Sequence, residues 1–203
     1  IAHLDGYLVC NTTNAYLEGD RVTPVPMVQA VYHDYTIMYS AWTSRWDLER
    51  DNGLAYVAKH ALAFCWGVKP GWNILNLLYR YDNHPVALSS SLRRYAAYRT
   101  ARKFLVYGQM LRPPVTRTAV PAVPVKWCIS YRQNYFSTLM SPVPGNTWRA
   151  PDGSFALVLY NITEQEQPVS VTLDRKTYQL GNGTFRALYP AGQSFTAIPD
   201  ANG

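Results

Sequence analysis

The proline-rich stretch of residues 113–125 most constrains the fold, because the sequence pattern changes there. Proline fixes its own φ and has no amide donor, so such a stretch disfavours helix and favours extended backbone. Before it, apolar side chains recur at helical spacing in residues 54–66 and 86–107. Beyond it come runs with strand character, at residues 127–131, 154–161, 169–173, 184–188 and 194–198. The pattern predicts two units, residues 1–112 and residues 113–203, and the second is expected to be a small antiparallel β-sandwich.

The first unit carries two short apolar runs, residues 7–10 and 27–32, each followed by polar residues. Continuous apolar runs of this length suit strands buried on both faces, as in a parallel sheet. The second run stops at His33 and Asp34, and α/β barrels place their chemistry where such strands end. The alternative is that His33 and Asp34 open a loop, with Asp34 capping the next element. Both interpretations stay open at this point.

The formal net charge is +6, although only 16% of the residues are charged. The densest basic segment is residues 93–103, where Arg and Lys residues are interleaved with Tyr95 and Tyr98 inside a helical pattern. A nucleic-acid-binding face has this composition, and so does the solvated side of an amphipathic helix. No nucleic-acid-binding motif accompanies the segment. The solvated face is therefore the favoured interpretation, and no nucleic-acid partner is expected.

The three cysteines, at positions 10, 65 and 128, are odd in number and far apart. This spacing predicts neither a structural metal site nor a disulfide framework. Cys65 lies in an apolar run and is expected to be a small core residue. The longest apolar stretch, residues 54–68, is interrupted by polar residues and is shorter than a bilayer span. The sequence thus predicts no metal and no membrane span.

Five short segments occur in one order along the chain: DGYL (5–8), PMVQAVYHDY (26–35), WGVKPGWN (66–73), YGQMLRPP (107–114) and TWRAPDGSFALVLYNIT (147–163). In this combination the chain resembles a group of bacterial glycoside-hydrolase-like proteins with a TIM barrel and a C-terminal β-sandwich. The resemblance extends over most of the chain, to about residue 174. It implies an α/β plus β fold, in which the C-terminal part of a (β/α)8 barrel precedes an antiparallel β-sandwich. The location of the protein stays open, with a secreted or periplasmic one favoured over a cytoplasmic one.

The resemblance further implies a glycan substrate, hydrolysed between two carboxylates, and this chemistry needs no cofactor. In such proteins the principal catalytic acids are expected on earlier strands and just before the DGYL segment. They are therefore expected upstream of Ile1, and this chain is expected to be inactive alone. Within the chain, Asp34 and Asp5 are the remaining candidates for a catalytic carboxylate.

Three residues are candidates for substrate binding: His33, Asp34 and Trp42. A carboxylate at position 34 can accept hydrogen bonds from two sugar hydroxyls, and His33 can donate to a third. Trp42 is a possible stacking platform for a sugar ring. Asp5 precedes its apolar run, so it lines the same site only if the segment around it forms a rim loop. Each residue also has a structural alternative, as a cap, a loop ion pair or a core side chain.

Two classes of function remain after these considerations. The first is the fragment of a glycoside hydrolase. The second is a non-catalytic carbohydrate-binding or scaffold module. Barrels and sandwiches both host many functions, so fold alone does not separate the two classes. The sequence leaves the sugar, the linkage, the stereochemical outcome and the oligomeric state undetermined.

Overall fold

The computed structural model describes residues 6–8, 26–39, 43, 45–70, 84–118, 121–129, 134–181 and 184–190 of this chain. The helices in these residues are α1 (Met27–Tyr32), α2 (Arg45–Glu49), α3 (Leu54–Cys65), α5 (Pro85–Thr100) and α6 (Arg102–Leu105), with the 3-10 turn η1 (Asp51–Gly53) before α3. The strands are β1 (Gly6–Leu8), β2 (Ile37–Tyr39), β3 (Gln109–Met110), β4 (Val115–Thr118), β5 (Val123–Ile129), β6 (Asn134–Met140), β7 (Gly145–Arg149), β8 (Phe155–Leu159) and β9 (Val169–Thr172).

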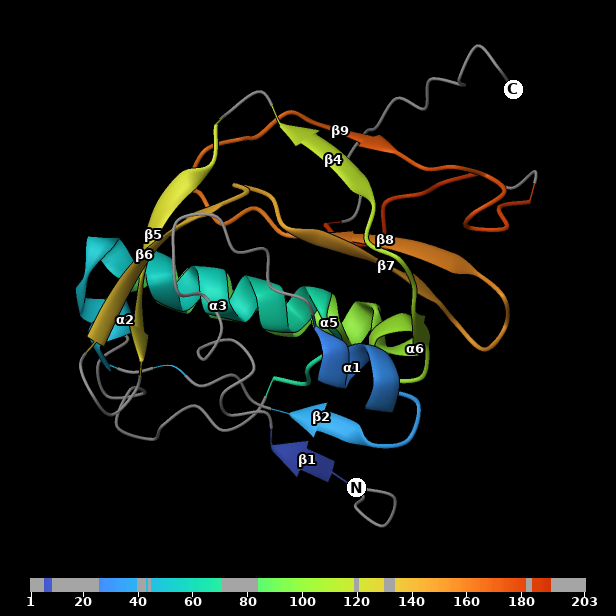
Figure 1. Ribbon diagram of the computed structural model, residues 1–203, viewed down its shortest axis with the longest axis horizontal. Helices are drawn as coiled ribbons and strands as arrows, with labels where there is room; N and C mark the ends of the chain where they lie inside the picture. Colours follow the sequence, from blue (N-terminus) through green and yellow to red (C-terminus); the bar gives the residue numbers. More distant parts are fainter. Residues whose placement is uncertain are drawn as a thin grey trace.

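Helices α3, α5 and α6 cross the middle of the molecule, with most strands on one side and the β1–β2 pair on the other (Figure 1). Strands β1 and β2 pair in parallel. The other strands form small antiparallel sheets, β3-β7-β8, β4-β9 and β5-β6. Helix α3 contacts β5 and β7, while α1 contacts β3. The helical layer is therefore covered by strands from the later part of the chain.

Helix α3 lies at the centre of the molecule, because each of its residues from Ala55 to Cys65 is buried. A helix that is apolar nearly all round is stable only when it is covered on all sides. Glycines at positive φ stand at both ends, Gly53 at φ 77° and Gly67 at φ 71°. Side chains disfavour this left-handed region, so glycine suits both turns. The helix expected over residues 54–66 is confirmed.

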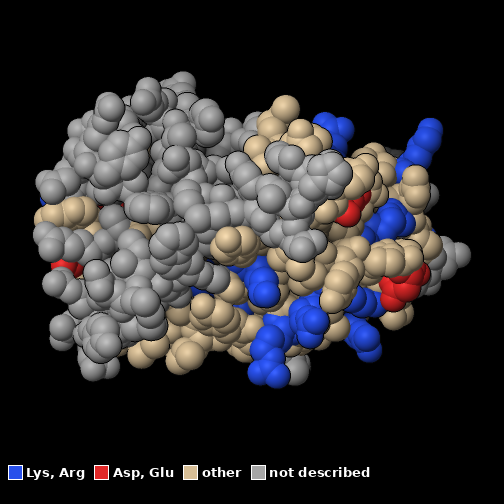
Figure 2. Space-filling model, turned by 90° about the horizontal axis from the view of Figure 1, so that it is seen from below, with Lys and Arg blue, Asp and Glu red and all other residues tan. Residues whose placement is uncertain are grey.

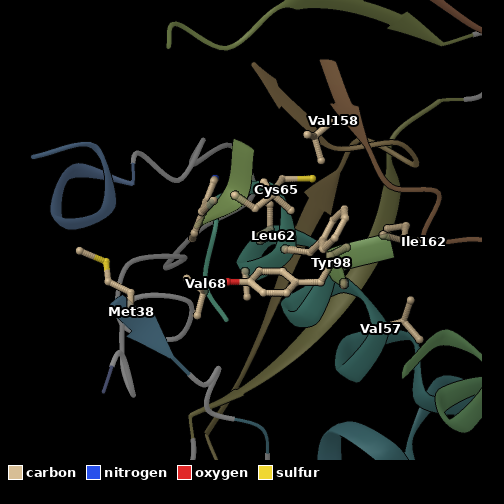
Figure 3. Close-up of a cluster of buried hydrophobic side chains, with 14 of the residues drawn as sticks. Met38, Val57, Leu62, Cys65, Val68, Tyr98, Val158 and Ile162 are labelled. Carbon is tan, nitrogen blue, oxygen red and sulfur yellow. The ribbon is translucent and has the colours of Figure 1, made fainter. Parts of the chain in front are cut away.

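The hydrophobic core is shared by helices and strands (Figure 3). Val57 and Leu62 of α3 and Tyr98 of α5 pack in the same cluster as Val158 of β8 and Ile162. Residues on both sides of the proline-rich stretch thus contribute to one core. The division into residues 1–112 and 113–203 stays a prediction.

Several sequence expectations are confirmed by these elements. The helix expected over residues 86–107 is present as α5 and α6, which are separated at Ala101. Strands occur where expected in β5, β8 and β9, and the side chains of β9 alternate in burial. Residues 184–188 form no strand in the described chain, and residues 194–198 lie outside it. Cys65 is a buried core residue, as expected.

The prediction that residues 27–32 form a buried strand is wrong, because this segment is helix α1. Pro26 precedes its first residue, and proline is well tolerated at a helix start. The run is also not uniformly apolar, since Gln29 lies inside it and is buried. His33 and Asp34 therefore follow a helix rather than a barrel strand.

The predicted fold class is also wrong. The described residues contain one parallel pair, β1–β2, and no barrel arrangement of strands and helices. The later strands are divided among small separate sheets instead of two facing sheets. One of these sheets includes β3, which precedes the proline-rich stretch and pairs with β7. Within the described helices, none has both the length and the apolar character needed to cross a bilayer.

Candidate functional site

His33 holds the end of helix α1 against the rest of the molecule. Its side chain is buried, and Nε2 lies 2.9 Å from the Leu105 carbonyl oxygen. Because a carbonyl only accepts, Nε2 carries the proton and donates it. The imidazole ring also packs at 4.7 Å from the Trp148 ring. His33 thus joins α1 to α6 and β7, and its role in substrate binding stays a prediction.

The space around His33 is closed by a tight backbone approach. A Cβ at Gly67 would lie 2.7 Å from His33 Nε2 and 2.6 Å from Trp148 Cη2. The Trp148 indole N–H in turn donates to the Cys65 carbonyl oxygen at 3.0 Å. The turn after α3 therefore fixes both rings. A glycine is required there by close contact as well as by its positive φ.

Helix α1 buries a polar side chain beside Val28, which packs against the core, and exposes several of its apolar ones. Gln29 is 1% exposed and His33 is also buried. In contrast, Met27 is 65% exposed and Val31 is 54% exposed. At 3.6 residues per turn, positions 27 and 31 share one face while position 29 lies about 200° away. The helix therefore presents its apolar stripe to solvent.

The turn between α1 and β2 also carries exposed side chains. Tyr32 is partly exposed, Asp34 is exposed, and Tyr35 is 77% exposed. Ile37, at the start of β2, is exposed as well. We call this surface the α1 surface, and its residues are Met27, Val31, Tyr32, Asp34, Tyr35 and Ile37. In the chain, Asp34 stands between the exposed residues Tyr32 and Tyr35.

Of the predicted site residues, the structure describes His33 and Asp34. Asp5 and Trp42 lie outside the described residues. Asp34 and His33 are neighbours in sequence, yet His33 points into the core while Asp34 is solvent-exposed. The predicted pairing of an imidazole donor with a carboxylate acceptor is thus not brought together at the α1 surface.

The other described carboxylates are either paired with lysine or exposed. Asp47 is fully buried and lies 2.8 Å from Lys59 Nζ. Asp152 is exposed and lies 2.9 Å from Lys103 Nζ. Hydrogen bonds from Ser154, and then the Lys103 ammonium, hold the pKa of the Asp152 carboxyl below its usual range. The remaining acids, Glu49, Asp51, Glu164, Glu166 and Asp174, are exposed.

Basic side chains gather on one face of the molecule, where they outnumber the acidic ones in the described part (Figure 2). Arg93, Arg99, Arg102 and Lys103 are exposed, as expected for the solvated side of α5 and α6, whereas Arg94 is buried. Across the described chain, no cluster of three His, Cys, Asp or Glu side chains is placed to hold a metal ion.

Reasoning from the sequence missed the apolar face of α1. The signals were present, since Met27, Val31 and Tyr35 recur every four residues and Gln29 interrupts the apolar run. If the same residues are taken to form a helix, the stripe can lie on its buried face or on its exposed face. The local pattern does not decide between the two. Comparisons with protein-family models, with curated proteins and with solved structures gave no match to this chain.

Proposed function

We propose that this chain binds carbohydrate through the α1 surface, as a binding module that does not hydrolyse glycosidic bonds by itself. The observation that carries the proposal is the exposure of Tyr35, 77% of whose surface is open to solvent beside the exposed Asp34. Contiguous exposed apolar patches, especially those with polar groups at the rim, mark contact or ligand-binding surfaces. The α1 surface combines such groups with a carboxylate.

The chemistry of the α1 surface suits a sugar ring. One face of a pyranose is lined by C–H groups, and an aromatic face packs against it. Tyr35 and Tyr32 supply such rings, and Met27 and Val31 extend the apolar area. An ionised carboxylate is an acceptor only, so Asp34 can accept hydrogen bonds from neighbouring hydroxyls. Together these groups match an amphipathic ligand with hydroxyls at its edge.

Binding is favoured over hydrolysis by the state of the described carboxylates. A glycosidase needs two carboxyl groups across the scissile bond, one of them kept protonated by apolar surroundings. Asp47 is the buried carboxylate of this set, and it is held by Lys59 at 2.8 Å. The others are exposed. Two-carboxylate hydrolysis by a longer protein stays a proposal that rests on the resemblance.

The test is affinity electrophoresis of the 203-residue chain in gels that contain xylan, laminarin or mucin glycans. We expect at least one polysaccharide to retard the wild type. Tyr35→Ala should weaken binding about twofold to tenfold, the usual contribution of an aromatic contact. Asp34→Asn should weaken it about tenfold or more, because charge-assisted hydrogen bonds are lost. Tyr189→Ala is the matched control, since Tyr189 is an exposed tyrosine outside the α1 surface.

Three outcomes would contradict the proposal. The first is an unretarded wild type in every gel. The second is equal retardation of Tyr35→Ala and wild type. The third is a concentration-dependent dimer in sedimentation that Tyr35→Ala dissociates, which would show that the α1 surface contacts a second copy. Hydrolysis of nitrophenyl glycosides that Asp34→Asn abolishes would instead make the chain an enzyme.

A further inference from the structure

Helices α3 and α5 meet along a seam of buried polar side chains. The Tyr56 hydroxyl lies 3.2 Å from Ser91 Oγ. One turn earlier, a Cβ at Gly53 would lie 3.6 Å from the Ala87 Cβ. The residue number rises on both helices from the first contact (Gly53 and Ala87) to the second (Tyr56 and Ser91). The two helices therefore run in the same direction here. Residues that follow Tyr56 on α3 and Ser91 on α5 therefore lie toward the same end of the seam.

Arg94 follows Ser91 on α5 and is only 3% exposed. Its Nε and Nη2 atoms are buried and have no hydrogen-bond partner. Among the described residues, no carboxylate lies within ion-pair distance of its guanidinium. The contact it does make is with the Tyr95 ring, whose centre lies 5.5 Å from Cζ. Arg94 is thus a buried cation whose Nε and Nη2 donors have no hydrogen-bond partner.

The two unused atoms form one edge of the guanidinium. Nε–H and one Nη–H of an arginine point in parallel, and this pair binds the two oxygens of a carboxylate or phosphate as a fork. The unpartnered Nε and Nη2 donors of Arg94 therefore match two oxygens of one oxyanion, whether a carboxylate or a phosphate.

Other buried polar groups belong to α3 and α5 or contact these helices. His60 lies one turn beyond Tyr56, is 3% exposed, and its Nε2 has no partner. The imidazole ring packs on the Tyr56 ring at 4.3 Å. From β8's C-terminal side, the Tyr160 hydroxyl lies 2.6 Å from Ser90 Oγ. Burial raises the pKa of the Tyr160 hydroxyl, and the positive charge of Arg94 acts in the opposite direction.

A buried guanidinium without a counter-charge is costly. Arginine does not lose its proton in proteins, so it cannot escape the cost by becoming neutral. Leaving one buried charge unpaired strongly destabilises the native state. A bound anion removes this cost, and the native state gains whatever free energy the anion contributes on binding.

We propose that the seam between α3 and α5 binds a small oxyanion, a carboxylate or a phosphate, through the Nε–Nη2 edge of Arg94. The burial of Arg94 restricts the ligand to a small group. His60 Nε2 and the hydroxyls of Ser90, Ser91 and Tyr160 are further polar groups of this seam. The site involves none of the residues of the α1 surface, so it stands or fails independently of carbohydrate binding.

The test is thermal unfolding of the whole chain in formate, acetate or phosphate, with sodium chloride at matched ionic strength as the reference. We expect the unfolding midpoint to rise and saturate with at least one oxyanion, relative to chloride. Formate and acetate report on a carboxylate ligand, and phosphate reports on a phosphate ligand. Arg94→Lys keeps the charge but loses the fork, and should weaken the apparent affinity at least about tenfold. Arg99→Gln, on the exposed face of the same helix, should behave like wild type.

A second measurement keeps the test decisive if Arg94→Lys does not fold. In the wild type, the Nε–H of a buried arginine exchanges slowly and gives a separate proton–nitrogen resonance. This resonance should shift and saturate with the same oxyanion. The proposal is overturned if no oxyanion raises the midpoint above the chloride reference, if Arg94→Lys responds as strongly as wild type, or if the arginine resonance does not move.

Discussion

Replacing Lys59 by methionine should strongly destabilise the chain, although both residues fill a similar volume. Lys59 Nζ lies 2.8 Å from Asp47 Oδ2, and both side chains are 0% exposed. Removing one partner of a buried pair leaves the other charge desolvated without its counter-ion, which costs about 3–5 kcal/mol. In a chain of this size, about 2–4 °C of melting temperature corresponds to each kcal/mol. We therefore expect the melting temperature to fall by roughly 6–20 °C.

The matched control is Lys103→Met. Lys103 Nζ lies 2.9 Å from Asp152 Oδ2, almost the same distance, but the two side chains are 49% and 59% exposed. Exposed pairs contribute little because solvent and salt screen them, so this variant should stay close to wild type. The measurement is the free energy of unfolding from urea titration, with thermal melts alongside. Equal losses in the two lysine variants would refute the reasoning that burial decides the strength of the pair.

A third variant separates loss of the pair from loss of volume. In Lys59→Met combined with Asp47→Leu, neither side chain is left charged in the interior. Replacing both charges of a buried pair by apolar groups is often neutral or even stabilising. We expect the double variant to recover most of the stability that Lys59→Met loses. A double variant less stable than Lys59→Met would show that Asp47 has a separate structural role.

Three further outcomes follow from other parts of the structure. Gly67→Ala should lose about 2–4 kcal/mol of unfolding free energy in urea titration, because the residue has positive φ and its Cβ would meet Trp148; a loss below that range would show that the turn relaxes. Burial raises the pKa of the Cys65 thiol, so in the native chain mass-mapped alkylation at pH 8 should spare it, and rapid native labelling would contradict its burial. Hydrogen bonds from Ser154 lower the folded-state pKa of the Asp152 carboxyl. Its contribution to stability is therefore present above the ordinary pKa of an aspartate, about 3.9, and is lost as pH falls further. The stability difference between wild type and Asp152→Asn, measured by urea titration, should therefore be constant above about pH 5 and shrink below pH 4. A difference that grows in acid would contradict the predicted direction of the pKa shift.

Local pattern was sufficient for the regular elements with strong periodicity. In α3 the apolar side chains recur at helical spacing between two glycines, and in β9 polar and apolar residues alternate. These signals depend on neighbours a few residues apart, so the sequence contains them directly. The same is true of the turn at Pro151–Gly153, which lies between β7 and β8 as its residues predict.

Prediction from the local pattern failed where contacts with distant parts of the chain determine which face of an element is buried. Residues 27–32 have a pattern compatible with a strand or a helix, and the structure makes them helix α1. Its polar face is inside because His33 reaches Leu105 and Trp148, which lie far along the chain. The exposed stripe with Met27 and Tyr35 follows from that choice. A prediction that places Met27 and Val31 in the interior because they are apolar therefore buries the wrong face of this helix.

The sequence by itself determined the two longest described helices, the switch to β-structure after the proline-rich stretch, and the core position of Cys65. Only the tertiary structure decided which charged side chains are buried. Lys59 looks like a solvated residue in the sequence, and Arg94 looks like part of an exposed basic face, yet both are enclosed. The physical reason is that burial depends on what packs against each face of a helix, and those neighbours come from segments that the local pattern does not specify.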